Sequence, residues 1–80
     1  MKILVAIRHS PVKYYLMSVN DLPAIDEIVG LLCQREHSRA ITTVFSRGYF
    51  EREVSAREVP LVKTDAILTE ESVHWDLMNK

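Results

Sequence analysis

The order of its hydrophobic patterns is the feature that most constrains the fold of this chain. Two segments, Lys2–His9 and Val12–Val19, are rich in β-branched and aromatic residues. The Ser10-Pro11 pair between them interrupts regular structure, so together the two segments predict a β-hairpin. Apolar residues occupy both faces of the first segment until Arg8, and we therefore expect that strand to lie in the centre of a sheet.

The segment Asp21–Gln34 predicts the main helix. Its apolar residues recur at steps of three and four and form a stripe that places Ile25 and Leu32 in the core. Asp21 is a suitable N-cap, and a proline two positions later fits the first helical turn. Gly30 weakens a helix, and we expect close packing of helix against sheet to explain it.

The residues after this helix predict a return to the sheet. Ala40–Ser46 has strong β character, and Arg47-Gly48 can turn the chain after it. Tyr49–Val59 fits either a fourth strand or a helix, because it mixes alternating apolar residues with good helix formers. We favour the strand, since a hairpin needs only the Arg47-Gly48 turn.

The last twelve residues, 69–80, predict a short C-terminal helix capped by Thr69. Apolar residues crowd this segment and would cover a broad arc of such a helix. We expect them to form a homodimer interface, which would consist of Val73, Trp75, Leu77 and Met78. The predicted fold is thus a single α+β domain over residues 1–80, with a small antiparallel sheet in ββαβ order covered by one main helix.

Composition excludes some functions and favours a compartment. A formal net charge of −1 provides no general attraction to nucleic acid or to a membrane surface. The single cysteine, Cys33, rules out an internal disulfide and suits a reducing compartment. The apolar run at the start ends at Arg8, too early for a targeting segment or a membrane span. We expect a cytoplasmic protein without a membrane partner.

Residue patterns that carry chemistry are sparse. Cys33 and His37 have the spacing of two metal ligands on a helix, yet a structural zinc site needs four. We interpret them as a buried cysteine and a histidine near the negative end of the main helix. The sequence has no glycine-rich phosphate loop and no recognisable catalytic motif. We expect no enzyme activity, no cofactor and no metal site.

Arginines concentrate in the middle of the chain and suggest a binding surface. We predict that it comprises Arg39, Arg47, Tyr49 and Arg52. The favoured function is a small protein-interaction or regulatory module that acts through this surface, through a homodimer interface, or through both. The alternative is a nucleic-acid-binding protein that uses the same four residues, since arginines beside an aromatic can hold a phosphate and stack a base. A third possibility is a small-molecule binder or enzyme subunit completed by oligomerisation.

Overall fold

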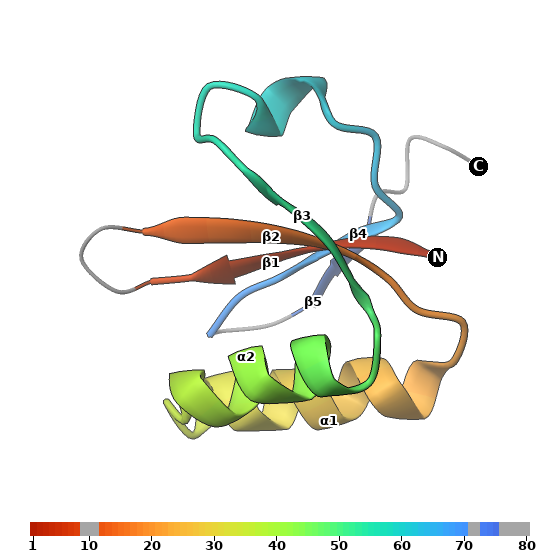
Figure 1. Ribbon diagram of the computed structural model, residues 1–80, viewed down its shortest axis with the longest axis vertical. Helices are drawn as coiled ribbons and strands as arrows, with labels where there is room; N and C mark the ends of the chain where they lie inside the picture. Colours follow the sequence, from red (N-terminus) through yellow and green to blue (C-terminus); the bar gives the residue numbers. More distant parts are fainter. Residues whose placement is uncertain (9–11, 71–72, 76–80) are drawn as a thin grey trace.

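The protein is an α+β domain in which two helices lie against one face of a mixed sheet (Figure 1). The computed structural model describes residues 1–8, 12–70 and 73–75, the last three by their backbone alone. The elements are β1 Lys2–Ile7, β2 Lys13–Ser18, α1 Leu22–Cys33, α2 His37–Ser46, β3 Phe50–Val54, the 3₁₀ turn η1 Val59–Leu61, β4 Ala66–Leu68 and β5 Val73–Trp75. The strand order in the sheet is β3-β2-β1-β4-β5.

The predicted hairpin and its central strand are confirmed. Strand β1 pairs antiparallel with β2, so that Lys2 lies opposite Ser18 and Ile7 opposite Lys13. On its other side β1 pairs in parallel with β4, where Ile3 lies opposite Ala66. Every residue from Ile3 to Ile7 is buried, as expected for a strand with neighbours on both edges and apolar residues on both faces.

The two faces of the sheet carry separate apolar clusters. Alternate residues of β1 and β2, among them Val5 and Met17, point toward the helices and join the main core. The residues between them, including Leu4 and Leu16, point to the opposite face. There a smaller cluster forms with Val54 and with half-buried residues of the segment that contains η1.

Helix α1 confirms the predicted helix. The Asp21 carboxylate accepts a hydrogen bond from the backbone N–H of Ala24 at 2.8 Å, which caps the first turn. Ile25 and Leu32 are buried, as the apolar stripe predicts. The explanation offered for Gly30 is wrong, because a Cβ atom at this position would meet nothing within 4 Å.

The predicted strand at Ala40–Ser46 is wrong, since these residues belong to helix α2. One face of α2 buries His37, Ala40 and Val44, whose spacings of three and four are those of a helix. Burial of this face on the main core outweighs the preference of its β-branched residues for strands. The sheet is therefore covered by two helices and not by one.

The strand that follows α2 has a different neighbour in the sheet from the predicted one, which was the segment Ala40–Ser46. Tyr49–Val59 forms strand β3 over Phe50–Val54, which confirms the favoured reading, but β3 pairs with β2. Gly48, at φ +72°, occupies the left-handed region that favours glycine and turns the chain from helix to strand. The prediction of an all-antiparallel sheet is also wrong because of the parallel β1–β4 pair.

The predicted C-terminal helix is wrong at Val73–Trp75, which form β5 antiparallel to β4. This pairing satisfies backbone groups that an unpaired edge of β4 would leave exposed. Residues 71–72 and 76–80 lie outside the described part of the chain. The predicted dimer interface of Val73, Trp75, Leu77 and Met78 consequently stays a prediction, because no side chain of this set is described.

Candidate functional site

An aromatic surface lies where helix α2 meets strands β2 and β3, and we define it by Tyr15, Ile41, Phe45 and Phe50. The rings of Phe45 and Phe50 are stacked, with centroids 4.2 Å apart and an interplanar angle of 22°. Tyr15 meets both rings edge-on, with centroid distances of 6.2 Å to Phe45 and 6.1 Å to Phe50. The two edge-on contacts of Tyr15 are favourable aromatic geometries.

Strand register and helix periodicity bring these side chains together. Phe50 lies opposite Met17, so it shares the helix-facing side of the sheet with Tyr15, two residues earlier on β2. Ile41 and Phe45 are four residues apart, on one flank of α2. No local residue pattern indicates this surface, because the predicted strand at Ala40–Ser46 would place Phe45 in the sheet and not on a helix.

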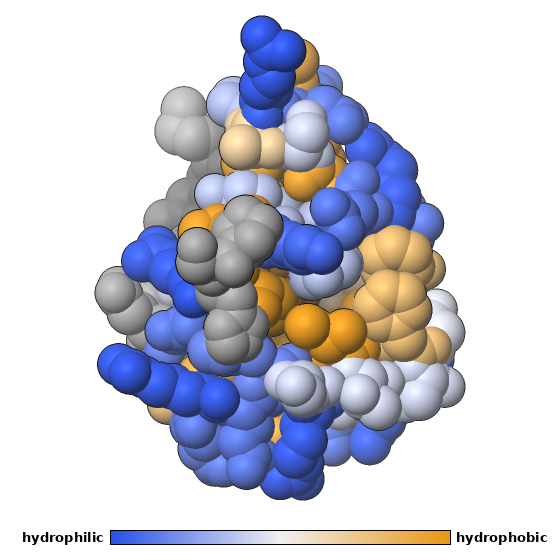
Figure 2. Space-filling model, turned by 60° about the vertical axis from the view of Figure 1, so that its left-hand side comes forward, coloured by the Kyte–Doolittle hydropathy of each residue, from blue (hydrophilic) through white to orange (hydrophobic). Residues whose placement is uncertain are grey.

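The aromatic surface is open to solvent. Phe45 is 48% exposed, and Tyr15, Ile41 and Phe50 are half-buried. Figure 2 shows apolar atoms gathered on this side of the molecule, toward the right of the view and above hydrophilic atoms. The narrow crevice between α2 and the sheet behind Phe45 has no room for a water molecule. The feature is thus an exposed apolar surface and not an enclosed pocket.

Two charged side chains border the aromatic surface. Lys13 lies opposite Ile7 and Glu53 opposite Tyr15, so the register places both on the helix-facing side of the sheet. Both residues are exposed. Within the described residues the side chain of neither takes part in a hydrogen bond or an ion pair. One unpaired cation and one unpaired carboxylate therefore flank Tyr15.

The structure keeps two of the four predicted arginine-surface residues together. Arg47 ends α2, and its Nη1 lies 2.7 Å from Oε1 of Glu27 on α1. Its guanidinium also donates a hydrogen bond to the side chain of Tyr49, and this bond, with the Glu27 charge, raises the pKa of Arg47. Tyr49 is half-buried against the main core.

The other two members of the predicted set lie elsewhere. Arg52 is opposite Leu16, on the sheet face away from the helices, with its Nη1 2.8 Å from Oε2 of Glu58. Arg39 lies near the start of α2, where it forms an ion pair with Glu36. A single partner that contacts Arg47 and Arg52 would have to reach both faces of the sheet. The set of four stays a prediction, but the structure does not assemble it into one surface.

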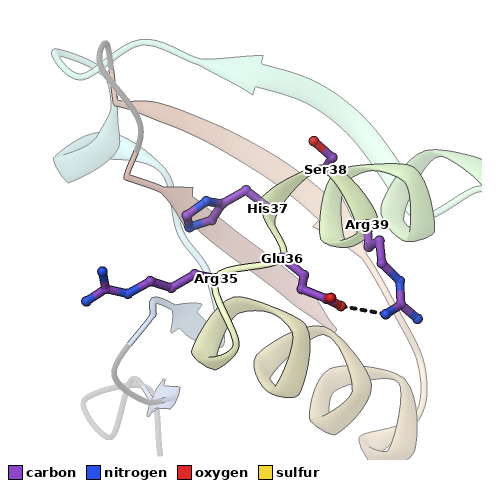
Figure 3. A pocket seen from close by; sticks show the side chains of 5 residues that line it. All are labelled: Arg35, Glu36, His37, Ser38 and Arg39. Atoms are coloured by element: carbon purple, nitrogen blue, oxygen red, sulfur yellow. Dashed lines mark hydrogen bonds and ion pairs between the residues drawn. The ribbon is translucent and has the colours of Figure 1, made fainter.

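The junction between α1 and α2 forms an open depression of about 330 Å³. Figure 3 shows Arg35 and Arg39 pointing away from one another, with Glu36 turned toward Arg39. The His37 ring is 9% exposed, and its Nε2 lies 2.6 Å from Oε1 of Glu70. Carboxylates thus hold two of the five lining side chains, Arg39 and His37. We attribute the depression to these contacts, which fix the junction between α1 and α2.

The structure corrects the interpretation of Cys33 and His37. Cys33 is exposed and not buried, and His37 begins the second helix, whereas the sequence placed it near the end of the first. Over residues 1–8 and 12–70, His, Cys, Asp and Glu side chains form no group of three or more that could hold a metal ion. None of the described helices has the length and apolar character needed to cross a membrane.

Comparison with known proteins returns no match to this chain among family models, curated proteins or solved structures.

Proposed function

We propose that this chain is a small protein-interaction module without catalytic chemistry of its own, and that its aromatic surface is the site where a protein partner binds. The observation that supports this proposal is the exposure of Phe45, which remains 48% accessible while stacked on Phe50. Contiguous exposed apolar side chains are costly in water and commonly mark contacts between proteins. Aromatic residues are also enriched at such contacts.

Other ligand classes fit the same surface less well. Pockets for small molecules typically enclose roughly 300–1,000 Å³, whereas the crevice behind Phe45 has no space for water. A nucleic acid would need several cations free to contact phosphates, whereas Lys13 at the border of this surface has the unpaired Glu53 carboxylate beside Tyr15 as its neighbour, and that carboxylate would repel a phosphate. Arg47, the arginine nearest in sequence to Phe45, is instead paired with the Glu27 carboxylate. The formal net charge of −1 adds no attraction to a polyanion.

A Phe45→Asp variant tests the proposal, with Leu61→Asp as its matched control. Leu61 is 80% exposed and lies in η1, which packs on the opposite face of the sheet. We expect the parent chain and Leu61→Asp to bind the same protein and Phe45→Asp to lose it, because a carboxylate there would be desolvated by an apolar partner.

The measurement has two steps. Affinity capture from the source cells, quantified by mass spectrometry, compares the three proteins, and the captured protein is then purified and titrated by calorimetry. Circular dichroism confirms that both variants are folded. Equal binding by folded Phe45→Asp and by the parent would refute the aromatic surface as the site.

A further inference from the structure

We infer that the partner seated on the aromatic surface is a second copy of this chain, placed by a two-fold axis so that Lys13 of each copy lies opposite Glu53 of the other. This inference rests on the proposed function and names its partner. It assigns the self-association interface to strands β2 and β3 and helix α2, and not to the C-terminal segment.

The two charged residues at the border of the aromatic surface indicate which partner fits it. Lys13 and Glu53 are on the same side of the sheet, flank Tyr15, and have no charged partner within the described residues. A partner rich in one charge would satisfy one of them and repel the other. A two-fold copy satisfies both, since it presents a carboxylate to each lysine and a lysine to each carboxylate.

The apolar part of the surface is self-complementary in the same way. A two-fold contact that pairs Lys13 with Glu53 places Tyr15 of both copies near the axis, because Tyr15 lies opposite Glu53 and two residues from Lys13, and the stacked Phe45 and Phe50 lie beside it. Each copy thus buries the exposed part of Phe45 of the other copy, and the contact needs no second apolar surface. Aromatic rings at the centre of a contact and charged side chains at its border are the usual composition of a protein interface.

Association through the outer edge of β3, which pairs with no strand among the described residues, is the competing geometry, and the sequence of β3 disfavours it. β3 carries three consecutive charged residues, Glu51, Arg52 and Glu53, and the pairing with β2 shifts register at Glu51. When two copies of β3 pair antiparallel about a two-fold axis, one residue lies directly opposite the same residue of the other copy. If that residue is Glu51, Arg52 or Glu53, two like charges face one another, which is destabilising. Charges and a bulge both protect edge strands from pairing. Two copies therefore meet through the aromatic surface and not edge to edge.

Charge reversal tests whether Lys13 of one copy contacts Glu53 of the other, and an assembly that stops at the dimer shows that the contact is two-fold. Lys13→Glu and Glu53→Lys should each weaken self-association by at least about tenfold, because each turns two attractive contacts per dimer into repulsive ones. An equimolar mixture of the two variants should form a heterodimer, since every contact between them is again between opposite charges. The double variant Lys13→Glu/Glu53→Lys should dimerise like the parent. Lys63→Glu is the control and should change nothing, since Lys63 is exposed and its side chain has no partner in the part of the chain that the structure describes.

Sedimentation equilibrium at tens of micromolar protein measures these outcomes, with circular dichroism on each variant. Recovery in the mixture shows that both variants are folded, so a loss in the single variants cannot be ascribed to misfolding. A parent chain that stays monomeric at about 100 µM, or single variants that dimerise like the parent, overturns the inference. If Phe45→Asp still loses a captured protein of another kind in that case, the proposed function stands with a different partner.

Discussion

His37 and Glu70 lie 33 positions apart in the sequence, yet Nε2 of the histidine is 2.6 Å from Oε1 of the glutamate. His37 is the first residue of α2, and Glu70 follows β4 after a single intervening residue. The contact therefore fastens the start of the second helix to the chain that leaves the parallel strand. The histidine side chain is 9% exposed and the glutamate side chain 20%, so solvent competes little for either group.

Replacing Glu70 with alanine should lower the free energy of unfolding by about 1–3 kcal/mol, because the buried imidazole loses a charged hydrogen-bond partner. Urea denaturation measures the change. The control is Glu58→Ala, which removes a carboxylate from the exposed ion pair with Arg52 and should cost about 0–1 kcal/mol. Equal losses in the two variants would show that the contact adds no more than a surface ion pair.

Gly30→Ala should stabilise the protein by about 0.5–1 kcal/mol, since the residue lies inside α1 and an added methyl group meets open space. The same substitution at Gly48 should destabilise it, because the φ of +72° there is strained for any residue with a side chain. Thermal unfolding of both variants gives the two opposite shifts. A lower melting temperature for Gly30→Ala would mean that the helix tolerates no side chain at this position.

Leu32→Ala should cost about 2–5 kcal/mol, enough to unfold much of a marginally stable domain of this size. Leu32 is fully buried in the main core, at the end of α1 that approaches α2. Leu22→Ala, at the exposed start of the same helix, should change stability by less than about 1 kcal/mol. Differential scanning calorimetry of the pair provides the measurement. A Leu32→Ala variant that melts within a degree or two of the parent would contradict the packing of α1 on the sheet.

The elements that could be predicted from the sequence are those whose local pattern and burial agree. The hairpin of β1 and β2 has strand-forming residues on both sides of a proline, and α1 has both an N-cap and an apolar stripe. For α2 the two signals conflict. Ala40–Ser46 contains several β-branched residues, but its burial follows His37, Ala40 and Val44 at helical spacing. Tertiary packing favours the helix over the strand for this segment. The signal in the sequence is the spacing of three and four between His37, Ala40 and Val44, which is that of a helix.

The parallel strand and the candidate site were harder to predict for a common reason. Strand β4 has three residues, too few to show a periodicity, and its partner β1 is distant in the sequence. The aromatic surface likewise joins residues of β2, α2 and β3 that no local pattern connects. Its detection required the correct assignment of Phe45 to a helix. The predicted arginine set was a list of neighbours in sequence, and the alternation of β3 placed Arg52 on the face away from the helices.

The parallel pairing of β1 with β4 also determines how late the sheet can close. β1 is the most deeply buried strand, but one of its two edges stays without a partner until Ala66–Leu68 can reach it from the far end of the described chain. Such a distant pairing is slow, because the loop entropy must be overcome before the contact contributes. A growing chain that has emerged only as far as β3 therefore carries an apolar strand with an open edge, and during synthesis that edge is available to a chaperone or to another unfinished chain.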